Sequence, residues 1–230
     1  GERREAVDGR QLEPAIDRLT PQTRPASPVI AWQRWHSMLF LHWALPADAI
    51  RRHVPRRLAL DTFEGDAWVT AGLFTVTGAR LRPLPAVPGL SSYHEAQLRT
   101  YVHLDGQHPG CWYFNHDATS LVACALGRAA LRMPYFLTRA KRSQLNDEHR
   151  FESKRVKLGK PQAEISVSWR STGAMVEAQP GSLEHFLTQR FYVYSPSAAG
   201  RLWREQLHHA PWPLFPAELI EVRQSLDEAH

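Results

Sequence analysis

The segment Tyr93–Leu104 constrains the fold of this chain most, because polar and apolar residues alternate along most of it. Successive side chains of a β-strand point to opposite faces, so this alternation predicts a strand with one polar and one mostly apolar face. The polar face collects Tyr93, Glu95, Gln97, Arg99, Tyr101 and His103. A carboxylate, an amide and a guanidinium in one row suit a polar cleft. The alternative is a solvated outer face on which Glu95 and Arg99 form a weak surface pair.

Strands dominate the predicted structure of the remaining chain. Further strands are expected at Ala31–Trp43, Ala67–Thr77, Trp112–His116, Arg150–Val156, Ala163–Trp169, Gln189–Tyr194 and Leu202–His208. Short helices are expected at Ala47–His53, Thr119–Met133 and Ser182–Thr188, with Asp117 or Thr119 capping the second and a serine capping the third. Together these elements predict a mainly antiparallel α+β domain with a sheet long enough to curl.

The size and composition of the chain favour one folded domain. Its 230 residues are 43% hydrophobic and 22% charged, which argues against disordered and collagen-like classes. Residues 1–30 mix charges with several prolines and show little apolar periodicity. We therefore predict an extended or disordered N-terminal arm over 1–30 and a single domain over 31–230.

The sequence also predicts where the protein resides. The least polar stretch, Met38–Leu45, is interrupted by His42 and is far shorter than the ~20 residues of a membrane-spanning helix. Gly1–Arg10 has charged residues and no apolar run, unlike a secretory signal peptide. We expect no membrane contact and a cytoplasmic location. Cys111 and Cys124 cannot form a disulfide framework and are expected to be buried thiols.

Several common chemistries lack their sequence signatures. The chain has 12 histidines but no HExxH motif, and the adjacent His208 and His209 would point to opposite faces of a strand. GxSxG elbows and phosphate-binding glycine loops are absent as well. We therefore expect no metal and no cofactor.

The basic stretch Arg128–Lys160 raises the question of nucleic-acid binding. Its aromatic residues, such as Tyr135 and Phe136, could stack on bases in a positive groove. The favoured interpretation is the end of a helix, a polar loop over Ser143–His149 and an edge hairpin whose cations protect it from aggregation. We expect no nucleic-acid partner.

Several segments together resemble the YqjF-like family of uncharacterised bacterial proteins. They are Trp35–Trp43, Pro46–Pro55, Leu60–Phe63, Val87–Leu90 with Glu95, Arg99–Val102, Trp112–Phe114 with Asp117–Ala118, and Pro211–Leu214. The likeness spans about Trp32 to Ala217. That family is similar to the acetoacetate-decarboxylase-like superfamily, which implies a curved antiparallel β-barrel or cone with a few flanking helices and a buried ligand cavity.

The more distant likeness can be followed along the chain until it fails. Tyr93–Ala96 is similar to a Tyr-x-Glu-Ala segment, which places Glu95 on the glutamate of the decarboxylase pocket. Gly127 and Arg128, followed by Pro134, resemble its Gly-Arg…Pro-Lys-Lys element. Tyr135 and Phe136, however, stand where the superfamily has two adjacent lysines, and His36 falls near the place of its substrate-clamping arginine.

The aromatic pair implies a change of mechanism. A Schiff-base lysine needs a neighbouring cation that lowers its pKa, and neither a phenol nor a phenyl ring can replace the amine. Only Lys141, Lys154, Lys157 and Lys160 remain in the chain, none of them in the matching motif. We therefore expect no Schiff-base acetoacetate decarboxylation.

The resulting hypothesis is a small-molecule pocket inside the barrel. Its expected residues are Glu95 and Tyr135 as acid or base, with Arg99, Arg128, His36 and His116 binding the substrate. The ligand would be anionic or carbonyl-bearing, and a reaction would be lyase-like or isomerase-like proton chemistry. The alternative is a non-catalytic binder of a hydrophobic or carbonyl-bearing metabolite. The sequence leaves both the enzyme question and homo-oligomerisation open.

Overall fold

The computed structural model describes residues 16–156, 163–197 and 201–225, and most of them belong to one curved sheet. Its main path follows β1 (Ala31–Leu45), β4 (Asp66–Leu81), β5 (Tyr93–Leu104), β6 (Gln107–Ala118), β7 (Tyr135–Leu145), β8 (Glu148–Arg155), β9 (Glu164–Ser171) and β12 (Ala217–Gln224). Off this path lie β2 (Ala59–Leu60), β3 (Thr62–Phe63), β10 (Tyr192–Pro196) and β11 (Leu202–Gln206). Among the described residues the strand pairings are antiparallel, except that β6 pairs in parallel with β7 and β10. The α+β fold expected from the sequence, a curved and mainly antiparallel sheet, is confirmed.

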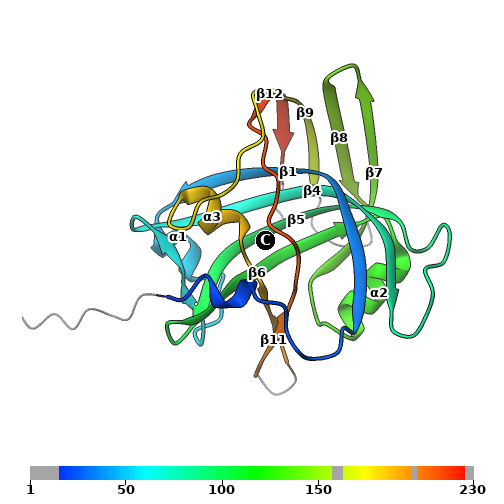
Figure 1. Ribbon diagram of the computed structural model, residues 1–230. Coiled ribbons are helices and arrows are strands. Elements are labelled where there is room, and N and C mark those ends of the chain that lie inside the picture. Colours follow the sequence, from blue (N-terminus) through cyan, green and yellow to red (C-terminus); the bar gives the residue numbers. More distant parts are fainter. Residues whose placement is uncertain (1–15, 157–162, 198–200, 226–230) are drawn as a thin grey trace, which may run out of the picture.

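The long strands and the helices divide the molecule into distinct regions. Figure 1 shows β1, β4, β5 and β6 as long neighbouring ribbons, with β7, β8, β9 and β12 rising at a steep angle from them. The helices are α1 (Ala47–Arg51), α2 (Leu121–Ala129) and α3 (Leu183–Thr188), with a 3-10 turn at Thr20–Gln22. In Figure 1, α1 and α3 lie near one end of the long strands and α2 near the other. Within the part of the chain that the structure describes, no helix combines the length and apolar character that a membrane crossing needs.

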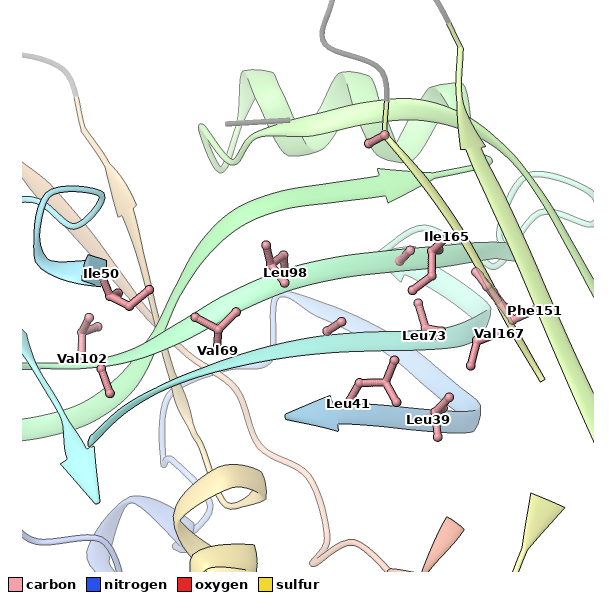
Figure 2. Packing of buried hydrophobic residues seen from close by; sticks show 14 of the residues in the cluster. Leu39, Leu41, Ile50, Val69, Leu73, Leu98, Val102, Phe151, Ile165 and Val167 are labelled. Atoms are coloured by element: carbon pink, nitrogen blue, oxygen red, sulfur yellow. The ribbon is translucent and has the colours of Figure 1, made fainter. Parts of the chain in front are cut away.

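Strand β5 separates two hydrophobic clusters. On one side, Ala96, Leu98 and Val102 join a cluster that reaches across to β8 and β9 through Phe151, Ile165 and Val167, as Figure 2 shows for most of these residues. On the other side, Tyr101 joins a second cluster with Cys111, Tyr113, Met133, Phe186, Leu187 and Val193. Both faces of β5 are therefore covered, and its polar side chains are not on a solvated outer face.

A buried ion pair joins β6 to β8. Arg155 donates from Nε to Asp117 Oδ1 at 2.7 Å and from Nη2 to Oδ2 at 3.0 Å, and both side chains are 2% exposed. The Arg155 guanidinium also lies 3.8 Å from the centroid of the Phe136 ring. Loss of either partner would leave an uncompensated charge inside the protein.

The structure corrects several boundaries. Strands β7, β12, β2 and β3 were not expected, and the predicted polar loop Ser143–His149 is wrong because Ser143–Leu145 belong to β7. Helix α2 is capped by Ser120, whose Oγ accepts from the Ala123 amide at 3.1 Å, and not by Asp117 or Thr119. Asp117 instead pairs with Arg155. Strand β5 and the serine cap of α3 were predicted correctly.

Part of the predicted arm contacts the folded domain. Residues 1–15 lie outside the described residues, whereas Arg18 donates two hydrogen bonds of 2.6 Å to the carboxylate of Asp61. Gln22 Nε2 lies 2.9 Å from His185 Nε2. The division into an arm over 1–30 and a domain over 31–230 stays a prediction.

We expect Arg155→Met to lower the free energy of unfolding by about 3–5 kcal/mol, because Asp117 would remain buried without its counterion. Urea denaturation measures the change. The matched control is Arg150→Gln, which breaks the exposed Arg150–Glu152 pair and should cost at most about 1 kcal/mol. Equal effects of the two substitutions would contradict the buried-pair account.

Candidate functional site

A cavity of about 110 Å³ lies on the polar side of β5. Glu95, Gln97 and Arg99 line it, and their exposed fractions are 3%, 5% and 7%. The solvated-face alternative for β5 is therefore wrong. The rest of the lining is Gln33, Trp35, Met38, Phe40, Phe74, Cys111, Tyr113, His116, Leu131, Met133, Tyr135, Thr188, Arg190, Tyr192, Val193, Glu205, Leu207, His209 and Trp212.

A β-bulge in β6 brings two further side chains to the cavity. The β5–β6 register shifts between Leu98 and Arg99, so Gln97 lies opposite His116 while Arg99 lies opposite Tyr113. Cross-strand partners point to the same face, so the bulge places Tyr113 and His116 together although they are three residues apart. Their ring centroids are 4.3 Å apart. Without the bulge, strict alternation would separate them.

Glu95, His116 and Tyr135 form the centre of the site. His116 Nδ1 lies 2.8 Å from Glu95 Oε1, and because a carboxylate accepts, the imidazole donates from Nδ1. The Tyr135 ring stacks on His116 with centroids 4.4 Å apart and planes 13° apart. Burial, and then the charge of Glu95, raises the pKa of Tyr135 well above its usual value. The Tyr135 phenol is therefore neutral and can act as a hydrogen-bond donor.

Helix α2 makes room for this stack at Gly127. A Cβ at that position would overlap the Tyr135 ring. The parallel pairing of β6 with β7 sets Tyr135 directly beside His116 in the register. Gly127 and the register together hold the phenol against the imidazole.

Arg99 is a buried cation of the same cavity. Its Nη2 donates to the Leu187 carbonyl at 3.4 Å, and its guanidinium carbon lies 5.1 Å from the Phe40 ring centroid. Burial by itself lowers the pKa of Arg99, but Cys111 and the neighbouring phenols raise it above its usual value. The guanidinium therefore stays charged.

Arg190 is a cavity residue that the sequence analysis missed. It lies between α3 and β10, is 5% exposed and donates from Nη1 to Asp61 Oδ2 at 2.5 Å. Its Nε donates to the Phe186 carbonyl at 2.6 Å. The segment Gln189–Tyr194 was predicted as a strand, and no local pattern in it shows that Asp61 pairs with Arg190.

Several buried polar atoms of the lining lack partners. Trp35 Nε1, Arg99 Nε, His116 Nε2 and Arg190 Nη2 have no hydrogen-bond partner among the described residues. Buried polar groups are nearly always hydrogen-bonded, to protein, water or a ligand. All four atoms belong to side chains that line the cavity.

His42 lies beside the site in a directed chain of hydrogen bonds. Tyr101 donates to the Leu187 carbonyl at 2.8 Å, so Thr70, 2.6 Å away, donates to the Tyr101 oxygen. Each hydroxyl has one proton, so His42 donates from Nδ1 to Thr70 across 2.8 Å. Burial, and then the charge of Arg99, lowers the pKa of His42 to about 4. His42 is therefore a neutral structural donor.

Two of the expected site residues lie elsewhere. Arg128 is exposed on α2, where its Nε donates to the Tyr135 carbonyl at 2.5 Å. His36 is exposed on β1 and lies 2.7 Å from Thr77 Oγ1, while its neighbour Trp35 lines the cavity. Neither Arg128 nor His36 lines the cavity, because a helix surface and the alternation of β1 direct them away.

Neither a metal-ligand cluster nor a lysine lies at this cavity among the described residues. Within the described ranges, no group of three or more His, Cys, Asp or Glu side chains is arranged to hold a metal ion. None of the described lysines, Lys141 and Lys154, lines the cavity, and Lys157 and Lys160 lie outside the described residues. Both cysteines are free and buried, as expected.

Residues 32–230 match the DUF2071 family, described as "Uncharacterized conserved protein". The chain belongs to this family. It is 34% identical over 198 residues to the "Uncharacterized protein YqjF" of Bacillus subtilis (strain 168), covering 86% of this chain and 80% of that protein. The resemblance to the YqjF-like family is thereby confirmed.

Solved structures similar to this DUF2071 chain share its fold. Acetoacetate decarboxylase from Legionella pneumophila is 15% identical with a TM-score of 0.52, covering 85% of this chain and 74% of that one. An acetoacetate decarboxylase-like enzyme from Sphingomonas wittichii is 13% identical with a TM-score of 0.51, covering 76% and 70%. The enduracididine biosynthesis enzyme MppR complexed with pyruvate is 14% identical with a TM-score of 0.51, covering 90% and 94%. At these identities the likeness establishes the fold alone.

We expect Gly127→Ala to destabilise the protein, although alanine favours a helix by about 1 kcal/mol over glycine. The added methyl group would displace the Tyr135 ring from His116. Thermal unfolding measures the sign of the effect. In a Tyr135→Ala background the overlap is gone, so the same substitution should become stabilising. A stabilising effect in the unaltered chain would contradict the close contact.

We expect His42 to titrate near pH 4, below the usual value of 6.5, in the NMR spectrum of the folded protein. Because the folded-state pKa is lowered, the contribution of neutral His42 to stability is complete above pH 6.5. It is lost as the pH falls toward 4. The free energy of unfolding should therefore depend less on pH over this window in His42→Gln. Titration near 6.5 would contradict the buried network.

Proposed function

We propose that the cavity binds a small carboxylate- or carbonyl-bearing molecule and that the Glu95–His116 pair moves a proton on it. The observation that carries this proposal is the set of unpaired polar atoms on Arg99, Arg190 and His116, all belonging to side chains of one cavity. Ligand oxygens would accept from the two guanidinium groups. The cavity volume favours a ligand smaller than the drug-sized molecules of ~300–1,000 Å³ pockets.

The tautomer of His116 supports a role as general base. Its Nδ1 proton is engaged by Glu95, so the neutral ring carries its lone pair on Nε2, which has no hydrogen-bond partner in the described part of the chain. Nε2 would take a proton from the carbon next to a carbonyl, and the resulting imidazolium would be stabilised by Glu95. The electron pair left on carbon becomes an enolate, which Arg99 and the Tyr135 phenol would stabilise. Return of the proton to carbon completes an exchange or an isomerisation.

This assignment changes the roles expected from the sequence. Glu95 orients the imidazole and stabilises its protonated form. His116 carries the proton, and Tyr135 donates a hydrogen bond to the enolate oxygen. The proposed reaction uses no amine adduct, because Tyr135 and Phe136 stand where the resemblance to the decarboxylases places two adjacent lysines. Pyruvate is a suitable probe because MppR, a protein of the same fold, is complexed with it.

The test is exchange of the pyruvate methyl protons in D₂O, followed by ¹H NMR. We expect the chain to accelerate exchange above the buffer rate, and His116→Gln or Glu95→Gln to lower the rate by about 10²–10⁴-fold. Glu148→Gln is the matched control, because Glu148 is exposed on β8 and does not line the cavity. Its exchange rate should equal that of the unaltered chain.

Thermal shifts with the same probes separate the two candidate functions. The apolar lining, including Trp35, Phe74 and Trp212, favours binding as the alternative without catalysis. Stabilisation by pyruvate with exchange at the buffer rate would support a non-catalytic binder. Neither stabilisation nor exchange with pyruvate, acetoacetate and other short carboxylates would contradict the proposed function.

A further inference from the structure

We infer that the ligand of this cavity is a short dicarboxylate, with Arg99 binding one carboxylate and Arg190 the other. This inference rests on the proposed function, because it assumes that the cavity binds a small molecule. Arg99 and Arg190 form two cationic subsites, and Arg18, from the segment that precedes β1, takes part in ligand selection.

The two guanidinium groups lie on one aromatic ring. The guanidinium carbon of Arg99 is 5.9 Å from the Tyr101 ring centroid, and that of Arg190 is 4.7 Å from the same centroid. Each is tied to a different carbonyl of α3, Arg99 to Leu187 and Arg190 to Phe186. The two guanidinium carbons can be no farther apart than the sum of these two distances, and their separate anchors keep them as distinct sites.

Arg99 makes no ion pair with a carboxylate among the described residues. The groups that raise its pKa are Cys111, Tyr101 and Tyr113, and burial raises the pKa of each of these three groups. At neutral pH they are an uncharged thiol and two uncharged phenols. A buried cation that lacks an anionic partner is costly, so an anion in the cavity would stabilise it strongly.

Arg190 has an acidic partner, but it shares that partner. Asp61 Oδ2 accepts from both Arg190 and Arg18, and Asp61 Oδ1 accepts from Arg18. Burial by itself raises the pKa of Asp61, and the two arginines bring it below its usual value, so Asp61 is ionised. One carboxylate thus faces two guanidinium groups and leaves one positive charge in excess.

Arg18 therefore acts as a positioning residue for the second subsite. It occupies both oxygens of Asp61, so Arg190 contacts the carboxylate through Nη1 alone and keeps Nη2 unpaired. Without Arg18, Asp61 would be free to take both terminal nitrogens of Arg190 and to neutralise it. The contact between Arg18 and Asp61 would therefore control how strongly the cavity attracts a second carboxylate.

The experiment compares chain-matched acids by isothermal titration calorimetry. Malonate, succinate and glutarate are tested against acetate, propionate and butyrate, with inorganic phosphate as a dianion on one centre. We expect the best dicarboxylate to bind at least about tenfold tighter than any monocarboxylate, as one added charge-assisted contact predicts. Arg190→Met should abolish this ratio, and Arg190→Lys, which keeps the charge, should restore part of it.

Arg18→Gln tests the positioning role. We expect it to lower dicarboxylate affinity severalfold while monocarboxylate affinity, which depends on Arg99, stays unchanged. A purely structural loss would lower both affinities alike and would contradict the role. Arg24→Gln is the matched control, since Arg24 is an exposed arginine of the same segment. Circular dichroism checks that each variant is folded.

The outcomes separate this inference from the proposed function. If no acid binds, the proposed function fails and the inference fails with it. If monocarboxylates bind as tightly as dicarboxylates, only the inference is overturned. Phosphate binding tighter than every dicarboxylate would place both arginines on one anionic centre and would likewise overturn it.

Discussion

Burial of charged side chains on the inner face of β5 governs the structure of this protein. Glu95 and Arg99 cannot lie at that depth without partners, because a charge in a low-dielectric interior is costly unless it is paired or hydrogen-bonded. Among the described residues, the fold supplies His116 for Glu95 and only carbonyl, phenol and ring contacts for Arg99. The unequal compensation of these two charges makes the cavity a candidate for binding an anion.

Pairing of buried charges also joins distant parts of the chain. Asp117 and Arg155 tie β6 to β8 with both charges satisfied. Asp61 instead gathers Arg18 from the N-terminal segment and Arg190 from the cavity wall, with one cation in excess. A satisfied pair stabilises the fold, whereas a cluster with excess charge remains able to attract a ligand.

The DUF2071 chain shares its fold with acetoacetate decarboxylases, and its cavity holds a stacked phenol and imidazole. Tyr135 stacks on His116, and Gly127 allows it to lie there. A neutral phenol on an imidazole cannot form an imine, but it can donate to an oxyanion next to a base. The proposed proton chemistry uses this phenol as a donor beside the imidazole.

Local patterns determined much of this protein. The period of two in Tyr93–Leu104 predicted β5 and its polar face. The aromatic residues at 135 and 136 led to the expectation, which stays a prediction, that no Schiff base forms. Strands such as β7 were not predicted, because charged residues interrupt the alternation of polar and apolar side chains along them. Tertiary structure alone decided that the β6 bulge turns His116 inward, that Arg128 points away, and that Asp61 is shared by two arginines. These contacts depend on register and on residues far apart in the chain, and sequence spacing carries no information about either.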